Sequence, residues 1–225
     1  MSFCPRRSLH APALLALALL AVAACGAGSE ARRPDAREHG AGPRPPPPPP
    51  PPPLTTRERI EKGGPSPASF FPLAVGNEWT YAVTTGGQTQ QETIHIVGRD
   101  GPWYLDDQRG RLRVEADGVR DADRYLLRAP LVAGSTWTAV DNLVVQQFEL
   151  SAVDVTLVTP SGRFEHCVVV RNDQPLPNGA RFVTEWTYGP GVGLVALRTF
   201  RTSAQGKETT QTSLTLVSYR LEGAR

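Results

Sequence analysis

Three cysteines are the residues whose chemistry this chain defines best: Cys4, Cys25 and Cys167. Cys25 directly follows Ala24, at the point where the apolar run 11–24 ends. A thiolate is a strong nucleophile, and small side chains before it leave room for a peptidase cleft. This arrangement predicts cleavage after Ala24 and attachment of a diacylglyceryl group to the Cys25 sulfur.

The apolar run itself is too short to be a resident membrane span. Residues 11–24 would extend about 21 Å as a helix, against about 30 Å of hydrocarbon in a bilayer. Arg6 and Arg7 precede the run and give it the positive start of an export signal. We therefore expect residues 1–24 to be removed from the mature protein.

The end of this segment, Val22-Ala23-Ala24-Cys25, resembles the lipobox of bacterial lipoproteins. The resemblance implies that the lipid on Cys25 holds the protein at the membrane, since two or three acyl chains anchor a soluble domain firmly. Gly26 stands where an aspartate would favour the inner membrane, so by resemblance to Gram-negative sorting the outer membrane is implied. An ordinary secretory signal with an incidental cysteine is the alternative.

Cys167 is the one thiol left once Cys4 is removed and Cys25 is lipidated. It could serve as a catalytic nucleophile, but its neighbour His166 should point to the opposite face of the same strand, which leaves only His95 as a base. These two histidines and one cysteine do not form a zinc spacing. We expect a buried structural thiol, with no catalytic residue, no metal site and no cofactor.

Carboxylates are the other candidates for chemistry. Glu115, Asp117, Asp121 and Asp123 flank a turn and could gather calcium, but they lack the spacing of calcium loops and alternate with arginines. A solvated hairpin is the expected structure. The glycine run 189–193 leads into a strand-like segment, so it is no phosphate loop. The sequence therefore predicts a protein that is not an enzyme.

The charge balance excludes one class of partner. The chain holds 24 basic and 22 acidic residues, and the signal peptide contains two of the basic residues, Arg6 and Arg7, and no acidic one. The mature chain thus has 22 of each, and no surplus of positive charge to neutralise phosphates. We expect no nucleic acid partner.

Residues 25–68 separate the anchor from the rest of the chain. They contain almost no large apolar side chain and include the unbroken run Pro45–Pro53. Such a segment cannot bury enough surface to fold, and nine prolines form a polyproline rod of roughly 28 Å. We expect a lipid-anchored, disordered, proline-rich linker that acts as a spacer. A docking site for a proline-binding module is the alternative.

Residues 69–225 have the pattern of a β-domain. Short alternating runs rich in Val, Thr, Tyr and Trp are separated by glycine-bearing turns, as in a meander of hairpins. The expected strands are 78–84, 90–97, 103–108, 111–116, 119–127, 136–140, 143–150, 152–158, 164–171, 181–188, 194–201 and 209–221. The predicted fold is mostly β, a single antiparallel meander curled into a half-barrel or barrel-like sheet, with a β-sandwich as the alternative.

Part of this domain repeats. The segment 72–80 (PLAVGNEWT) returns 58 positions later as 130–138 (PLVAGSTWT), and Glu185-Trp186-Thr187-Tyr188 echoes residues 78–81. In each copy a tryptophan sits on the predicted strand. We expect Trp79, Trp137 and Trp186 to be core anchors, and the alternative is that they line an aromatic ligand cleft.

Residues 70–221 resemble a group of uncharacterised bacterial exported and lipid-anchored proteins. The resemblance rests on the FPLxVGNxWTY-type opening at 71–81, on Gly162-Arg163-Phe164-Glu165-His166-Cys167 and on the segment 188–195. It implies a shape and a compartment, and no enzyme chemistry.

Three hypotheses about function follow. The first is a membrane-anchored lipoprotein whose β-domain binds an envelope protein or an apolar ligand. The second is a lipid or lipoprotein carrier that holds an acyl chain in a concave face. The third, an envelope hydrolase that uses Cys167, is the least favoured. A filled core with an exposed apolar patch would favour the first over the second.

Overall fold

The computed structural model of this chain describes residues 65–141 and 143–222. The predicted signal peptide 1–24, the lipidation site Cys25 and most of the predicted linker lie outside the described residues. The elements are η2 (Pro67–Phe70), β1 (Glu78–Thr85), β2 (Gln88–Asp100), β3 (Trp103–Asp106), β4 (Arg111–Glu115), β5 (Gly118–Arg120), β6 (Tyr125–Arg128), β7 (Thr136–Asp141), β8 (Val144–Thr159), β9 (Gly162–Pro175), η3 (Pro177–Gly179), β10 (Arg181–Gly189), β11 (Gly193–Thr202) and β12 (Glu208–Arg220). The ordered domain thus includes the last residues that we assigned to the linker.

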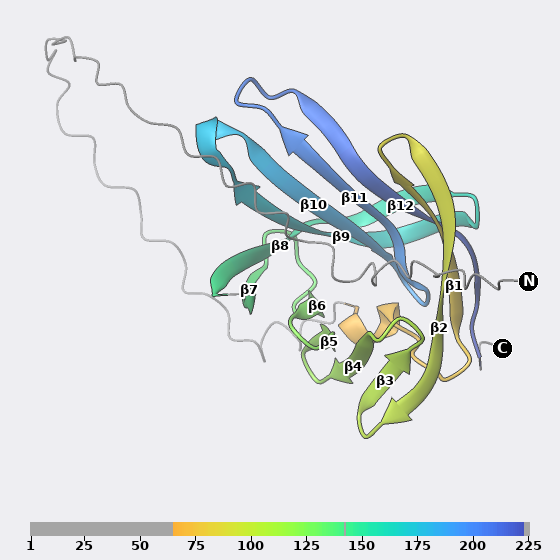
Figure 1. Cartoon of the computed structure of the whole chain (residues 1–225). Helices are drawn as coiled ribbons and strands as arrows, with labels where there is room; N and C mark the ends of the chain where they lie inside the picture. The colour runs from red at the N-terminus through yellow and green to blue at the C-terminus, as the bar shows by residue number, and fades with distance from the viewer. Residues whose placement is uncertain (1–64, 142, 223–225) are drawn as a thin grey trace, which may run out of the picture. The chain divides into compact units, whose positions relative to one another are not determined.

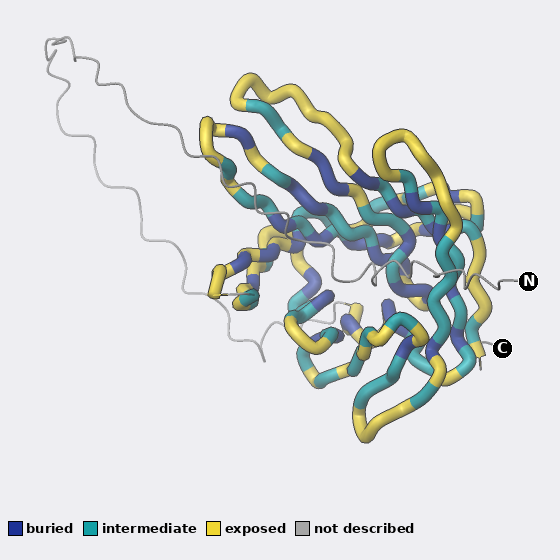
Figure 2. The backbone as a smooth tube through the Cα atoms, in the orientation of Figure 1, coloured by how far each residue is buried: buried dark blue, intermediate teal, exposed yellow. Residues whose placement is uncertain are grey.

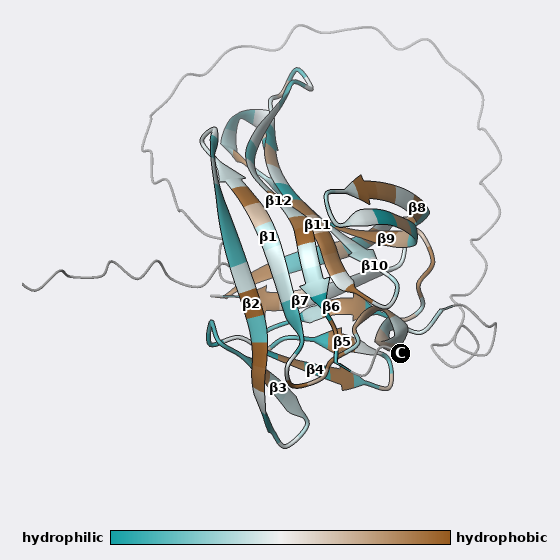
Figure 3. Ribbon diagram, turned by 90° about the vertical axis from the view of Figure 1, so that its right-hand side faces the viewer, coloured by the Kyte–Doolittle hydropathy of each residue, from teal (hydrophilic) through white to brown (hydrophobic). Residues whose placement is uncertain are grey.

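Alternation of side chains builds these strands. In β1 Trp79, Tyr81 and Val83 are buried. Glu78 and Thr80, which alternate with them, are partly exposed. Because successive side chains of a strand point to opposite faces, this pattern buries one face of the sheet and leaves the other to solvent. Figure 3 shows the same alternation of hydrophobic and hydrophilic residues along the strands.

All twelve strands belong to one antiparallel sheet, in the order β6-β5-β4-β3-β2-β1-β12-β11-β10-β9-β8-β7. Each hairpin joins neighbours, and β1 pairs with β12, so the first and last strands lie side by side in the middle of the sheet. Figure 1 shows the sheet curling until β6 approaches β7. The prediction of a single curled, barrel-like meander is confirmed, and the alternative of a sandwich is wrong.

The two edge strands of the sheet are β6 and β7, and they meet at a seam. No ladder joins them, but the Trp137 indole Nε1 on β7 donates a hydrogen bond of 3.1 Å to the Tyr125 carbonyl on β6. Unpaired edges expose backbone groups to other chains, and closure removes that hazard. A side chain therefore makes the contact that a backbone ladder makes elsewhere in the sheet.

The internal repeat of the sequence is a repeat of structure. The Gly76 amide donates to the Ile96 carbonyl and the Ile96 amide to the Asn77 carbonyl, at 2.8 and 2.9 Å. In the second copy the Gly134 amide donates to the Leu150 carbonyl and the Leu150 amide to the Ser135 carbonyl, both at 2.8 Å. Both glycines have a positive φ, 96° and 86°. The repeated segment is thus a glycine turn that starts a hairpin.

The third repeated segment, residues 185–188, shares a different feature with residues 78–81, which is a shift in strand register. The ladder between β1 and β12 shifts register between Thr80 and Tyr81, and the ladder between β10 and β11 shifts between Thr187 and Tyr188. These positions correspond in the repeated Glu-Trp-Thr-Tyr sequence. Bulges of this kind increase local twist and help a sheet to curl.

Two predicted divisions between strands were wrong, and β2 and β9 are longer and β3 is shorter than predicted. The segment 119–127, expected as one strand, forms β5 and β6 because the Asp121 carboxylate accepts bonds of 2.8 Å from the Asp123 and Arg124 amides and fixes a turn. The segments 143–150 and 152–158 form one strand, β8. Its ladder with β9 shifts register between Leu150 and Leu157, so the strand bends without ending.

The core occupies the inside of the curled sheet. Buried side chains run along the middle of the strands, and the hairpin ends are exposed (Figure 2). Phe70, 1% exposed, and Phe71 come from η2 and the residue after it and pack into this core, where Phe71 lies 5.3 Å from Tyr188 between ring centroids. The short N-terminal segment therefore fills part of the space that the sheet encloses.

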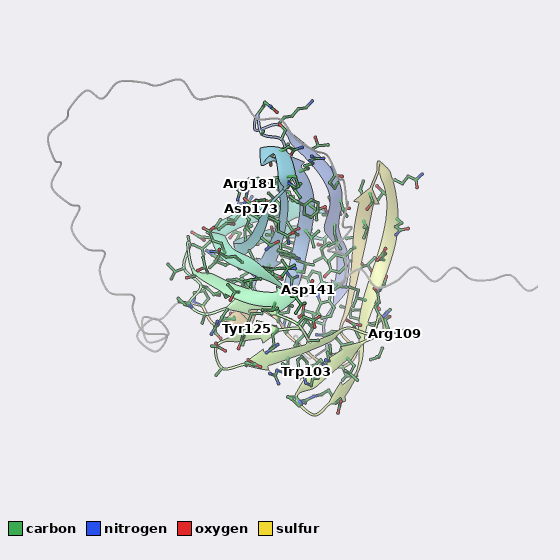
Figure 4. All side chains as sticks on the ribbon, turned by 60° about the vertical axis from the view of Figure 1, so that its left-hand side comes forward. Trp103, Arg109, Tyr125, Asp141, Asp173 and Arg181 are labelled. Carbon is green, nitrogen blue, oxygen red and sulfur yellow. The ribbon has the colours of Figure 1, made fainter. Side chains whose placement is uncertain are left out.

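Strands β9, β10 and β11 carry a row of paired charges on one face. Glu185 accepts from Arg171 at 2.9 Å and from Arg198 at 2.6 Å, its register partners on the two neighbouring strands. Asp173 and Arg181 lie next to one another in Figure 4, joined at 2.7 Å. Opposite charges on facing strands favour the observed register.

Candidate functional site

The tryptophans singled out in the sequence lie in the packed interior. Trp79 is 6% exposed and its Nε1 donates to the Val192 carbonyl at 2.7 Å, while Trp137 is 4% exposed. The Trp137 ring stacks on Phe148, with 6.1 Å between centroids. Both indoles are thus surrounded by the protein's own groups.

Trp186 is covered by a cation of the protein itself. The guanidinium carbon of Arg124 lies 4.3 Å from the centroid of Trp186 and 4.9 Å from that of Phe148. Arg124 also pairs with Asp121, at 3.7 Å. A guanidinium over an aromatic face is a stabilising contact, and here it occupies the ring surface that a ligand would need.

The interior of the curled sheet is filled. Aromatic and aliphatic side chains from η2, β5, β6, β7, β8, β9 and β10 form one continuous core. An open groove of about 470 Å³ lies outside this core, at the ends of two hairpins, and is lined by residues that include Asn178, Arg201 and Lys207. A carrier needs an open apolar cavity, whereas the core residues of the described sheet pack against one another.

Cys167 lies in this packed part of the domain, fully buried. Burial raises the pKa of its thiol, and its Sγ points to the Phe164 carbonyl, 3.6 Å away. The neighbouring His166 is exposed and pairs with Asp154 at 2.6 Å through Nδ1. The thiol and the imidazole therefore face different surroundings, and the thiolate needed for nucleophilic attack is disfavoured.

His95 is the centre of a connected group of titratable side chains. Its Nδ1 lies 2.7 Å from Asp107 Oδ2 and its Nε2 lies 2.9 Å from Glu78 Oε2. Arg220 also reaches Glu78, at 3.3 Å. The hydrogen bond to Asp107, opposed by partial desolvation and reinforced by Glu78, raises the pKa of His95. Both ring nitrogens are engaged, so the imidazole joins β1, β2 and the turn after β3 rather than presenting a free base.

The acidic stretch runs from β4 to the turn between β5 and β6, and Glu115, Asp117 and Asp121 are partly buried and paired with neighbouring side chains. The Tyr125 hydroxyl donates to Glu115 at 2.6 Å and to Asp117 at 3.1 Å, and Asp117 also pairs with Arg128. The hydrogen bond to Glu115, with burial and Asp117, raises the pKa of Tyr125 to about 12. Among the described residues there is no group of three His, Cys, Asp or Glu that could hold a metal ion.

The turn between β7 and β8 carries an unusual concentration of exposed aliphatic side chains. Val140, Val144 and Val145 are 63%, 53% and 66% exposed, and Leu143 is 97% exposed. We call these four residues the apolar tip. Single exposed apolar residues are ordinary on protein surfaces, but four on one hairpin end form a patch, and such patches mark contact sites.

The apolar tip projects because of how β8 pairs. The ladder between β8 and β9 begins at Phe148 opposite Asn172, whereas β7 pairs with β8 up to Asp141 opposite Val144. Residues 144–147 of β8 therefore pair with β7 and not with β9, which continues to Pro175 beside β10. Asp141, labelled in Figure 4, ends β7 and accepts a bond of 3.2 Å from the Gln146 amide.

The apolar tip is the site that reasoning from sequence missed. The valines and the leucine beside this turn were assigned to strands. The available signal was the turn itself: residues 139–145 read AVDNLVV, without the glycine that marks most other hairpins of this chain. Aliphatic residues flank this turn on both sides.

No helix in the described ranges is both long and apolar enough to span a bilayer.

Comparisons with known proteins found limited similarity. No protein-family model matches the chain, and no curated protein matches it. Among solved structures, a Bacteroides fragilis protein named as exported and as having a YmcC-like fold is similar at 13% identity and a TM-score of 0.44, over 67% of this chain and 98% of that one. A Parabacteroides distasonis protein named as a lipoprotein is similar at 13% identity and a TM-score of 0.40, over 68% and 98%. These are likenesses only, and they assign the chain to no family.

Proposed function

We propose that this protein is a lipid-anchored envelope protein that acts by binding another envelope component through the outside of its β-domain, and that it is not an enzyme. The observation that supports this most directly is the combination of a filled interior with an exposed apolar tip. A carrier would need the opposite arrangement, an open apolar concavity.

The anchor in this proposal is the lipid on Cys25, in the outer membrane. Its support is the sequence alone: the apolar run 11–24 and the small residues before the cysteine. Mass spectrometry of the protein purified from its host tests this part. The expected N-terminal peptide begins at Cys25 and carries the mass of a diacylglyceryl group and an amide-linked acyl chain, and Cys25→Ser removes both.

The binding part is tested in living cells with a photo-crosslinking amino acid. Placed at Leu143 in the apolar tip, it should capture an envelope component on illumination. Placed at Gln205, an exposed residue of the β11–β12 turn, it serves as the control. If Leu143 captures no more than Gln205, the apolar tip is not a contact site and this part of the proposal is wrong.

A further inference from the structure

We infer that the apolar tip is a membrane-contacting element, and that its four aliphatic side chains enter the interfacial layer of the bilayer to which the protein is tethered. This inference rests on the proposed lipid anchor, and it adds the identity of the contacted component. The argument has four steps: the chemistry of the tip, its shape, the depth it can reach and the length of the tether.

The chemistry of the tip favours lipid over protein. Val140, Leu143, Val144 and Val145 are aliphatic, and no aromatic or arginine side chain stands among residues 139–145. Protein interfaces depend on aromatic and arginine anchors in a patch of roughly 800 Å² on each partner, and four aliphatic side chains offer much less. Association with a bilayer requires only exposed aliphatic surface, and an element as small as a hairpin end can insert.

The shape of the tip suits insertion. The first residues of β8 pair with β7 alone, so the hairpin end is a two-stranded ribbon that stands clear of β9. Leu143 lies at its end with a φ of 66°. A ribbon of this kind can enter a planar layer without bringing the rest of the sheet with it.

Backbone and charge limit the depth. The ribbon leaves backbone groups unpaired along its edges, and such groups cannot be buried in hydrocarbon. The Asp141 carboxylate, bonded to Gln146, must also remain among the headgroups. Strands rise about 3.3 Å per residue, so Leu143 reaches about 10 Å beyond Gln146. This matches the depth of roughly 5–10 Å at which interfacial elements lie.

Because the protein is tethered to the bilayer, even a weak contact between the apolar tip and lipid is enough to hold the tip at the membrane. Residues 26–64 separate Cys25 from the described domain, and a chain of this length can extend to at most about 130 Å. The domain cannot leave the vicinity of the bilayer, so the tip meets lipid at a high effective concentration. Insertion of the tip would then hold the domain in one orientation on the membrane.

The test uses the acylated protein with an environment-sensitive fluorophore on Leu143→Cys, reconstituted in phosphatidylcholine vesicles. Cys25 carries lipid and Cys167 is buried, so the label goes to position 143. Brominated acyl chains should quench this label at least about three-fold more strongly than the same label on Val158→Cys, since only an inserted group lies within short range of the acyl chains. Val158 is a matched control because it is also an exposed aliphatic residue, 69% exposed. It lies on β8 as well, at the end of the strand opposite to the apolar tip.

A second measurement uses flotation of the unlipidated Cys25→Ser protein with the same vesicles. Leu143→Asp should lower the vesicle partition coefficient about ten-fold or more, because it removes the burial of a leucine and adds a charge. Val158→Asp should leave the partition coefficient unchanged. Equal quenching at positions 143 and 158, or equal partition of both aspartate variants, overturns the inference.

The outcomes separate the two proposals. If the acylated protein floats with vesicles and position 143 is not quenched, the anchor is retained and the membrane-contacting tip is rejected. If the protein from its host carries no lipid on Cys25, the proposed anchor fails, whatever the label reports. A disulfide between two Leu143→Cys chains in solution, without quenching in vesicles, would instead show that a second copy covers the tip.

Discussion

His95 is held between two carboxylates that belong to different parts of the sheet. Glu78 comes from β1 and Asp107 from the segment between β3 and β4, and Arg220 of β12 shares Glu78. A protonated imidazole donates to both carboxylates, whereas a neutral one can donate only from one nitrogen. The protonation of one side chain therefore affects contacts among elements far apart in the sequence.

This arrangement predicts a stability that depends on pH. Because the pKa of His95 is raised in the folded state, its contribution is fully present below the unfolded pKa of about 6.5 and is lost as pH rises through the folded value. His95→Gln should lower the free energy of unfolding by about 0.2–1 kcal/mol at pH 5.5, the range for solvent-exposed ion pairs, and by less at pH 9. Urea denaturation at the two pH values measures this.

Asp107→Asn provides the control, since Asp107 is the main cause of the raised pKa. In the Asp107→Asn background, the loss of unfolding free energy caused by His95→Gln should depend less on pH. An effect of His95→Gln that is the same at pH 5.5 and pH 9 would show that the imidazole contributes by packing alone.

At the scale of elements, the seam between β6 and β7 rests on one side chain. Trp137→Phe keeps an aromatic ring beside Phe148 but removes the donor to the Tyr125 carbonyl. We expect a loss of about 1–3 kcal/mol in the free energy of unfolding, with faster amide exchange in β6 and β7. Trp79→Phe, which also loses a bond to a carbonyl, should leave exchange in those two strands unchanged.

The repeated glycine turns give a second prediction at this scale. Gly134 has a φ of 86° and open space around the position of a Cβ atom, so Gly134→Ala should cost about 1–2 kcal/mol through the backbone alone. Gly98→Ala is the matched control: Gly98 in β2 also has open space, and its φ lies outside the left-handed region. Thermal unfolding should separate the two variants, and equal midpoints would contradict the argument.

The sequence allowed most of these elements to be predicted, because alternation and glycine turns are local signals. Strands β1, β7 and β10 lie within one residue of expectation. What could not be predicted depends on contacts between distant residues. The Asp121 side chain ends β5 by accepting hydrogen bonds from backbone amides, and the exposure of the apolar tip depends on where the ladder between β8 and β9 ends. A valine has the same hydropathy on a projecting ribbon as in a core.

At the scale of the whole molecule, the described sheet encloses a continuous core of its own side chains. Tyr81 and Tyr188 are both buried, and desolvation is the main cause that raises their pKa values. Tyr81 nevertheless satisfies its hydroxyl by donating to the Leu194 carbonyl at 3.1 Å. Buried polar groups are thus paired within the protein, as in a structural core.

Uptake of a fluorescent fatty acid tests whether the interior of the domain can hold an acyl chain. We expect no saturable quenching of tryptophan fluorescence, because the Trp79 and Trp137 side chains are both buried within the protein. The measurement is best made on Leu143→Asp, so that the apolar tip does not contribute a surface site. Stoichiometric quenching in that variant would show that the interior opens and would restore the carrier hypothesis.

The pairing of β1 with β12 also makes the order of strands cyclic. The Glu222 amide donates to the Asn77 side chain at 2.8 Å, so the end of the described domain lies beside the residue that precedes β1. The chain crosses the seam once, through residues 129–135, and no ladder is broken there. A circular permutant with its new termini in that connection, and a short linker from residue 222 to residue 65, should therefore keep every strand pair and fold to the same sheet.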